Sequence, residues 1–308
     1  MGTPEFAVSS LDILVKNGYD VVAVVTATDK PGGRSGRELL QSAVKKYALE
    51  KGIPILQPPK LKAPEFLLQL EALRADLQIV VAFRMLPEVV WSMPSLGTIN
   101  LHGSLLPRYR GAAPINWAVI NGERETGVTT FFIRQEIDTG DILLQKKMTV
   151  GENETAGEVH DRMMELGAQA VLETVQMLEK GNCVLQKQDT SLVSQAPKIF
   201  HETCEINFNQ SAEAVHNFIR GLSPYPGAWT RLHWAAGTDT DRFEGMEVKL
   251  LQTRKAQVPA VHPAGEFVTD GKKLLRIATA DGYVDILELQ VAGRRKMDAV
   301  SFINGLKS

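Results

Sequence analysis

The segment INLHGSLLPRYRGAAP, residues 99–114, holds the densest set of side chains able to do chemistry. Alternate side chains of a strand share a face, so we expect Asn100 and His102 together on one side. An asparagine amide can donate a hydrogen bond to a developing oxyanion, and a histidine can donate or accept a proton near neutral pH. For this pair alone, the common alternative is a polar strand end satisfied by local hydrogen bonds.

A second candidate is the tetrapeptide Asp138-Thr-Gly-Asp141, a tight turn between two predicted strands. We expect Gly140 to take positive φ and the aspartates to bond neighbouring backbone amides. Turn aspartates usually have no other task, so a catalytic role requires this turn to fold over Asn100 and His102. A carboxylate beside His102 would hold the orientation of the imidazole. The three side chains together can bind a carbonyl oxygen, move a proton and stabilise charge without a serine or cysteine nucleophile.

The elements around these residues predict an α/β fold. Residues 21–26 and 77–83 are continuous, β-branched-rich runs, typical of strands buried on both faces. Helical spacing over residues 39–51 and 64–73 separates them, which predicts parallel pairing in a doubly wound sheet. Residues 97–102 read as a further strand. Because such sheets place ligand clefts at the carboxyl ends of their strands, Asn100 and His102 are expected at a cleft.

The pattern also predicts a second domain. Thr155 and Glu158 form a capping box that opens a long amphipathic helix, and Gly181 ends it. We expect a first domain over residues 1–183, a linker over 184–202 and a second domain over 203–308. The second has a helix at 212–222, and its short strands favour a small β-barrel. Those strands are expected at residues 228–234, 248–253, 265–269, 274–279 and 284–291.

Composition restricts the function classes. A net charge of −2 over 308 residues gives no global positive field for nucleic acid, so RNA contacts would need local basic patches. Cys183 and Cys204 are far apart and lack metal-ligand spacing, so neither a disulfide framework nor a zinc site is indicated. No apolar run approaches the roughly 18 residues that cross a bilayer. The N-terminus lacks a signal-peptide pattern, and we expect a cytoplasmic protein without membrane contact.

The N-terminal residues raise a separate expectation. MGTPEF leads directly into a helix predicted over residues 7–17, and a Gly-Thr-Pro segment of this kind is typical of a strand-to-helix turn. An α/β sheet lacking the preceding strand would leave neighbouring backbone groups unpaired. We therefore expect the native chain to start about eight residues upstream of Met1.

A series of motifs gives the chain a specific resemblance. MGTPEFAV at the start, DKPGGR at 29–34, SLLPRYRGAAPINW at 104–117, ETGVT at 125–129 and DTGD at 138–141 stand in order. This series resembles the methionyl-tRNA formyltransferases, and SPYPGAW at 223–229 extends the likeness more weakly toward the end of the chain. The resemblance implies a Rossmann-like formyltransferase domain with a mostly parallel sheet, followed by an oligonucleotide-binding-like (OB-like) barrel.

The same resemblance implies an activity. The formyl group of 10-formyltetrahydrofolate would pass to the α-amine of methionyl initiator tRNA, for translation initiation, on a monomeric enzyme without a metal. The catalytic residues fall on Asn100, His102 and Asp138. The first two would donate hydrogen bonds to the oxyanion. Asp138 would polarise His102 and relay the amine proton through water to the departing folate nitrogen. The loop that contacts the reduced folate falls on Ser104, Leu105, Leu106 and Pro107.

The loop KPGGRSGR, residues 30–37, is basic and glycine-rich, which suits phosphate and base contacts. A bare run of this kind is usually a solvated loop. The resemblance instead implies a wedge into the acceptor end of tRNA, with Arg34 as its key side chain beside Lys30 and Arg37. After Gly36 the family's proline-rich segment is replaced by a glutamate and Leu-Leu-Gln-Ser. In the second domain, candidate basic patches contain Lys272, Lys273, Arg276, Arg294, Arg295 and Lys296.

Three alternative functions have weaker support in the sequence. A formyltransferase acting on an amino-sugar nucleotide would share the Asn-His-Ser-Leu-Leu-Pro core, although DKPGGR, GAAPI and DTGD favour the tRNA enzyme. A dinucleotide-dependent oxidoreductase would need a G-x-G-x-x-G after the first strand, which the sequence lacks. A non-catalytic RNA-binding module would have no need for Asn100, His102 and Asp138.

Overall fold

The computed structural model describes residues 1–32, 38–238 and 240–306. Contacts between residues divide the chain into two compact units. The first comprises Met1–Pro114, Thr126–Met148 and His160–Gln195, and the second comprises Ile115–Glu125, Thr149–Val159 and Ala196–Ser308. The predicted linker, residues 184–202, is therefore shared between the units, with its first part in unit 1. Domain boundaries at residues 183 and 203 stay a prediction.

Unit 1 contains the predicted α/β sheet, in two parts. One part is β1 (Val24–Val25) paired in parallel with β4 (Ile55–Leu56). The other has the strand order β5-β6-β8-β9, in which β5 (Gln78–Val81) and β6 (Thr98–His102) are parallel. β6 and β8 (Glu125–Phe132) are antiparallel, and β9 (Ile142–Thr149) lies beside β8. Parallel pairing is found for β1 with β4 and for β5 with β6, although β1 and β5 belong to separate parts and do not pair with each other. The antiparallel pairing of β6 with β8 makes the second part mixed, where a mostly parallel sheet was expected.

Helices and short segments complete this unit. The helices are α1 (Glu5–Lys16), α2 (Ala43–Lys51), α3 (Pro64–Ala72), α4 (Glu88–Trp91) and most of α6 (Ala156–Glu179). The predicted capping box is confirmed, since the Thr155 amide donates to Glu158 at 2.8 Å and the Glu158 amide donates to Thr155 at 3.3 Å. Further short elements are β7 (Arg110–Gly111), η1 (Thr190–Leu192) and β10 (Gln195–Ala196), of which β7 and β10 pair.

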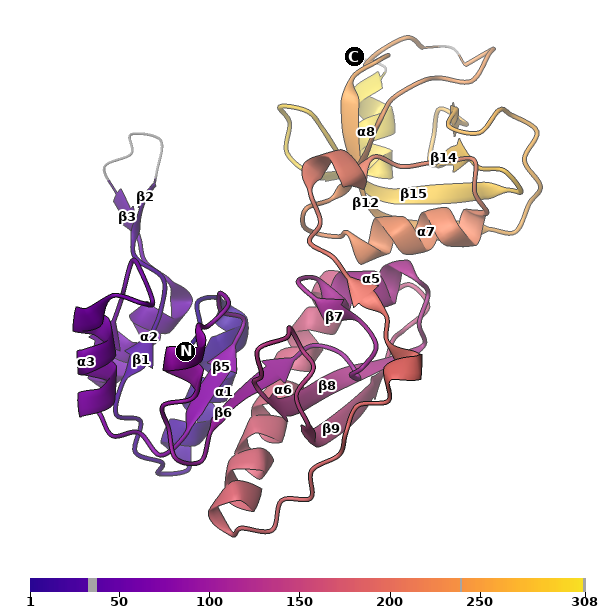
Figure 1. Ribbon diagram of the computed structural model, residues 1–308. Helices are drawn as coiled ribbons and strands as arrows, with labels where there is room; N and C mark the ends of the chain where they lie inside the picture. The colour runs from indigo at the N-terminus through magenta and orange to yellow at the C-terminus, as the bar shows by residue number, and fades with distance from the viewer. Residues whose placement is uncertain (33–37, 239, 307–308) are drawn as a thin grey trace. The chain divides into compact units, whose positions relative to one another are not determined.

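A hairpin precedes α2 where the sequence predicted a longer helix. β2 (Lys30–Gly32) pairs with β3 (Glu38–Leu40), and the hairpin stands out from the helices of its unit (Figure 1). The helix begins only after Ser42 because its hydroxyl accepts the Lys45 amide at 3.0 Å and caps the first turn. The prediction of a helix from residue 39 was therefore wrong at its start.

A cavity separates the two parts of the sheet. Gly2 donates to the Val25 carbonyl at 3.0 Å, and Val81 donates to the Met1 carbonyl at 2.9 Å, so these first residues lie between β1 and β5. Behind them is a cavity of about 740 Å³, whose walls include residues 19–25 and 74–79. The strand predicted over residues 21–26 is a strand only at Val24–Val25, because residues 21–23 line this cavity without a strand partner. An additional strand before Met1 stays a prediction.

Unit 2 is built on an antiparallel sheet with the order β11-β12-β15-β14-β13, with β16 paired to β15. Its strands are β11 (Ala228–Arg231), β12 (Glu247–Ala256), β13 (Phe267–Thr269), β14 (Leu275–Ala278), β15 (Tyr283–Val291) and β16 (Met297–Asp298). Its helices are α5 (Pro114–Ile120), η2 (His201–Cys204), α7 (Ala212–Gly221) and α8 (Ala299–Leu306). All five predicted strands are present. The named strands of the described residues form an open path, and an isolated parallel bridge joins Trp234, just after β11, to Phe267 of β13. The predicted barrel is therefore not shown by the strand order itself.

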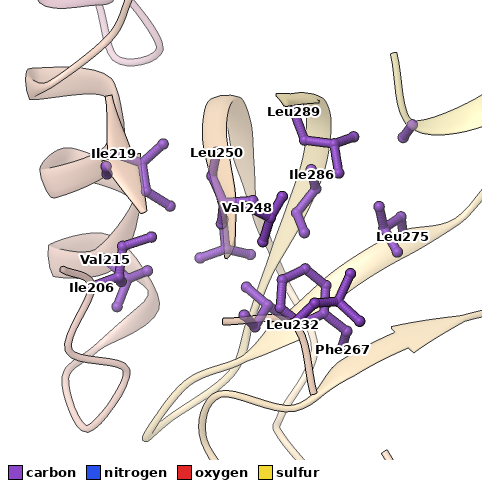
Figure 2. Packing of buried hydrophobic residues seen from close by; sticks show 14 of the residues in the cluster. Ile206, Val215, Ile219, Leu232, Val248, Leu250, Phe267, Leu275, Ile286 and Leu289 are labelled. Atoms are coloured by element: carbon purple, nitrogen blue, oxygen red, sulfur yellow. The ribbon is translucent and has the colours of Figure 1, made fainter. Parts of the chain in front are cut away.

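One apolar core holds this second unit together. Val215 and Ile219 of α7 lie on one side, and Leu250, Phe267 and Ile286 of the sheet lie beside them (Figure 2). Each of these side chains is at most 2% exposed. Burial of such side chains contributes roughly 1.5–3 kcal/mol each. In the part of the chain that the structure describes, no helix has both the length and the apolar character needed to cross a membrane.

Candidate active site

His102 and Asp138 lie against each other at the carboxyl end of β6. His102 is the last residue of that strand and its side chain is buried. The Nδ1 atom of the imidazole lies 3.7 Å from Oδ2 of Asp138, and both side chains are less than 10% exposed. The turn between β8 and β9 therefore folds over the end of β6, which was the condition for giving Asp138 more than a structural task.

The Asp138 turn is held in an unusual backbone conformation. Asp138 has a φ of 55°, in the left-handed region where aspartate is tolerated better than most residues. Its Oδ2 accepts the Gly111 amide at 2.8 Å. The expectation that Gly140 takes positive φ was wrong, since the positive φ falls on Asp138. Glycine is required at 140 for a close approach, because a Cβ there would lie 1.6 Å from the Phe132 carbonyl oxygen.

Asn100 precedes His102 by two residues on β6, so strand alternation puts both side chains on the same face. It is half-buried, and its carboxamide makes no hydrogen bond to any described residue. The amide N–H groups are therefore available to a carbonyl oxygen, which is what an oxyanion donor needs.

The His102 ring is bonded on its other edge. Nε2 lies 2.8 Å from the Tyr109 carbonyl oxygen, which can only accept, so Nε2 carries the proton in this arrangement. Nδ1 then faces Asp138 across a gap that is longer than a hydrogen bond. Nδ1 is thus the nitrogen able to exchange a proton with a third atom. Donation from His102 to a substrate oxygen stays a prediction.

The predicted folate loop is folded tightly beneath the site. Ser104 and Leu106 are buried, Pro107 follows a cis peptide bond, and Leu105 is half-buried. Thr129 donates to the Ser104 carbonyl at 2.7 Å and accepts the Leu106 amide at 3.1 Å. The loop therefore has a fixed path on β8 before any ligand arrives.

Nothing in the sequence indicated three residues that contact the site, namely Gln145, Arg110 and Gln188. The Gln145 amide donates to the Leu106 carbonyl at 2.8 Å. Gln188 lies in the predicted linker and bonds to the Asp138 turn on one side and to Arg110 on the other. Residues 184–201 have a weak pattern, and no local signal marks Gln188 as part of the site.

The predicted RNA-contacting loop is described only at its base. Lys30 is exposed on β2, whereas Arg34 and Arg37 lie outside the described residues. Asp29, just before β2, accepts the Lys45 ammonium at 2.5 Å and the Gln57 amide at 2.9 Å. The hydrogen bond from Lys45 holds the pKa of the Asp29 carboxyl below its usual value.

The basic residues of unit 2 are partly paired with acidic neighbours. Arg276 lies 3.0 Å from Asp285, and Lys296 lies 3.2 Å from Glu288. Arg294 lies over the Phe243 ring at 4.7 Å. The acidic partners reduce the local positive charge of the basic patches that the sequence predicted in this unit. In the described ranges, no group of three or more His, Cys, Asp or Glu side chains has an arrangement that could hold a metal ion.

Comparisons with known proteins bear on both units. The family described as Formyl transferase matches residues 1–175, and the family described as Formyl transferase, C-terminal domain, matches residues 198–307. The chain is 51% identical to methionyl-tRNA formyltransferase of Parabacteroides distasonis over 312 residues, covering 100% of this chain and 94% of that protein. It is 48% identical to the protein of the same name from Flavobacterium johnsoniae over 307 residues, covering 99% and 95%.

Solved structures share the fold at lower identity. The sugar 3N-formyl transferase WlaRD, solved in the presence of dTDP and 5-N-formyl-THF, has a TM-score of 0.65 at 20% identity, covering 96% of this chain and 97% of that one. An N-formyltransferase from Helicobacter canadensis, in complex with folinic acid and dTDP-3-aminofucose, has a TM-score of 0.63 at 21% identity, covering 92% and 96%. At these identities the likeness concerns the fold alone.

Proposed function

Because the chain belongs to the methionyl-tRNA formyltransferase family, we propose that Asn100, His102 and Asp138 carry out its transfer step. The reaction moves the formyl group of 10-formyltetrahydrofolate to the α-amine of methionyl initiator tRNA, for translation initiation. The observation that carries the assignment is the contact of His102 with Asp138 at the carboxyl end of β6. Two titratable side chains from distant parts of the sequence meet there, beside an amide with free donors.

Each side chain has a distinct task in this proposal. Asn100 donates a hydrogen bond to the formyl oxygen as negative charge develops on it, when the amine nitrogen forms its bond to the formyl carbon. His102 Nδ1 accepts the proton that the amine loses, since Nε2 already carries one, and the protonated Nδ1 then donates a hydrogen bond to the oxyanion. The Asp138 carboxylate, 3.7 Å away, stabilises the charged imidazole. The same proton then passes to the folate nitrogen as its bond to the formyl carbon breaks.

The pre-formed loop at Ser104, Leu105, Leu106 and Pro107 is the proposed contact for the reduced folate. Thr129 and Gln145 already fix the backbone of this loop, so folate binding loses little conformational entropy of the protein. Leu105 is the half-buried member of the loop, and its side chain can cover an apolar part of the ligand.

For the RNA, we assign the acceptor end to the loop bearing Lys30, Arg34 and Arg37. The Asp29–Lys45 pair fixes the base of its hairpin, and Lys30 is exposed. We take unit 2 to be an OB-like domain, and we expect it to supply further contacts to the phosphates of the tRNA. A steep loss of tRNA affinity with added salt is the expected signature. We further propose that the enzyme acts as a monomer in the cytoplasm.

The test is a turnover assay with 10-formyltetrahydrofolate and charged initiator tRNA. Removing one oxyanion donor typically costs about 2.7–4 kcal/mol, so Asn100→Ala should lower kcat by roughly a hundredfold or more, and we expect a similar loss for His102→Ala. His160 is a matched control, being a partly exposed histidine 3.1 Å from its own aspartate neighbour, Asp161. His160→Ala should leave kcat within about twofold of the parent.

Two results would count against the proposal. Retention of kcat in both Asn100→Ala and His102→Ala would remove the assigned mechanism. Formyl transfer to a nucleotide amino-sugar, without transfer to the charged tRNA, would reassign the acceptor.

A further inference from the structure

Gln188 ties the Asp138 turn to a neighbouring strand. Its carboxamide nitrogen donates to the Asp138 carbonyl and to the Gly140 carbonyl, each at 2.8 Å. One amide group thus uses both of its N–H bonds on the same turn. Of residues 184–190, Gln188 is the one whose side chain is not exposed. A contact of this kind, in a segment that is otherwise solvated, indicates a specific task.

The other end of the same carboxamide is bound by an arginine. Gln188 Oε1 accepts from Arg110 Nε at 3.1 Å and from Arg110 Nη2 at 2.5 Å. The next residue, Gly111, donates its amide to Asp138 Oδ2 at 2.8 Å. Asp138 is therefore held at two points, its carboxylate by Gly111 and its carbonyl by Gln188. Both holding residues connect to β7.

Two holding points are needed because the turn does not favour this geometry by itself. A non-glycine residue at a φ of 55° is held there by its surroundings, and Asp138 would relax toward negative φ if they were removed. Such a change would rotate the carboxylate away from the His102 ring. A displacement of about 1 Å in a reacting group can cost on the order of a hundredfold in rate.

We propose that Gln188 is a positioning residue for the transfer step, which sets the distance between the Asp138 carboxylate and the His102 imidazole. It acts through Asp138 and touches neither substrate. The inference rests on the proposed function, because it matters only if Asp138 takes part in the reaction. Arg110 orients the Gln188 carboxamide so that its nitrogen, and not its oxygen, faces the turn.

The first test replaces Gln188 with glutamate. The shape is kept and the contact with Arg110 remains, but an oxygen now meets the carbonyls of Asp138 and Gly140 and repels them. We expect kcat to fall by about tenfold to a hundredfold while KM for both substrates stays within about threefold. The matched control is Gln186→Glu, the same change on an exposed side chain of the same segment, which pairs with Ile142 through its backbone. That variant should leave both constants within about twofold.

The second test asks whether Gln188 acts through Asp138. In an Asp138→Asn background, adding Gln188→Glu should change kcat by less than about twofold, because the group being positioned is already disabled. A merely structural role would give the same loss in both backgrounds. If Gln188→Glu does not fold, Arg110→Met removes the other end of the contact and is expected to give the same loss and the same non-additivity.

The outcomes separate the two proposals. Full kcat in Asp138→Asn would overturn the catalytic assignment itself. A collapse of kcat in Asp138→Asn together with normal kcat in Gln188→Glu would overturn the positioning role alone. Multiplicative losses in the double variant would do the same.

Discussion

In a chain that begins at Met1, burial of the α-ammonium makes the stability of the fold depend on pH. The group donates to the Ile79 carbonyl at 2.6 Å, and burial lowers its pKa from 8.0 to about 5. The folded state therefore binds fewer protons than the unfolded state between these values, so stability rises with pH across this window. It is greatest above pH 8 and falls as the pH drops to 5. A pKa lowered this far corresponds to a decrease of about 4 kcal/mol in the free energy of unfolding between pH 8 and pH 5.

A change of the N-terminus isolates this effect. In a parallel ladder, the N–H and C=O of one residue point to the same side of the strand. The carbonyls of Val25 and Ile79 both accept from the first two residues, so the N–H groups of Val25 and Ile79 also face the cavity. A peptide added before Met1 can pair with both edges. We expect an extension of about five valine and isoleucine residues to fill the cavity as a central strand.

The assay is urea denaturation at pH 5, 6.5 and 8 for three chains. These are the present chain, the chain with the valine–isoleucine extension, and a control with a glycine–serine extension of equal length, which moves the charge but adds no apolar side chains. His216, whose pKa burial lowers, also destabilises the fold as pH falls, but all three chains share it. The present chain should lose about 4 kcal/mol more than either extended chain between pH 8 and pH 5. Only the apolar extension should raise stability at pH 8.

An equal pH dependence in all three chains would refute the reasoning about the ammonium. Equal stability of the two extended chains at pH 8 would refute the strand-filled cavity.

Three further predictions follow from contacts elsewhere. Lys45→Met removes the partner of Asp29 at the base of the hairpin, and KM for tRNA should rise several-fold while kcat at saturating tRNA stays within about twofold in steady-state assays. Arg220→Met should lower the free energy of unfolding by about 2–4 kcal/mol in urea denaturation. The buried guanidinium donates to the carbonyls of residues 151 and 154, and the methionine makes neither bond. Asp141→Asn should leave kcat within about twofold, since among the described residues the Asp141 carboxylate pairs only with Arg134, which is largely exposed. Asp138→Asn should instead lower kcat by about a hundredfold. Equal losses for the two aspartates would assign the turn a structural role.

The sequence predicted the elements that depend on near neighbours. Strand alternation placed Asn100 and His102 on one face, and the capping box marked the start of α6. Both signals come from residues only two or three positions apart in the sequence. The order of motifs then identified the family, which the full-length comparisons confirm. The start of α2 was misplaced, because the helix-like spacing from residue 39 onward did not reveal that Glu38–Leu40 pair with Lys30–Gly32.

Residue types and local periodicity thus determined which side chains of this protein are able to do chemistry and roughly where its helices and strands lie. Tertiary structure alone decided that Asp138 meets His102, that its turn needs a left-handed aspartate, and that Gln188 holds it in place. The reason is physical. A side chain carries its own chemistry and biases its nearest neighbours, whereas a distance between residues far apart in the chain is set by how whole elements pack.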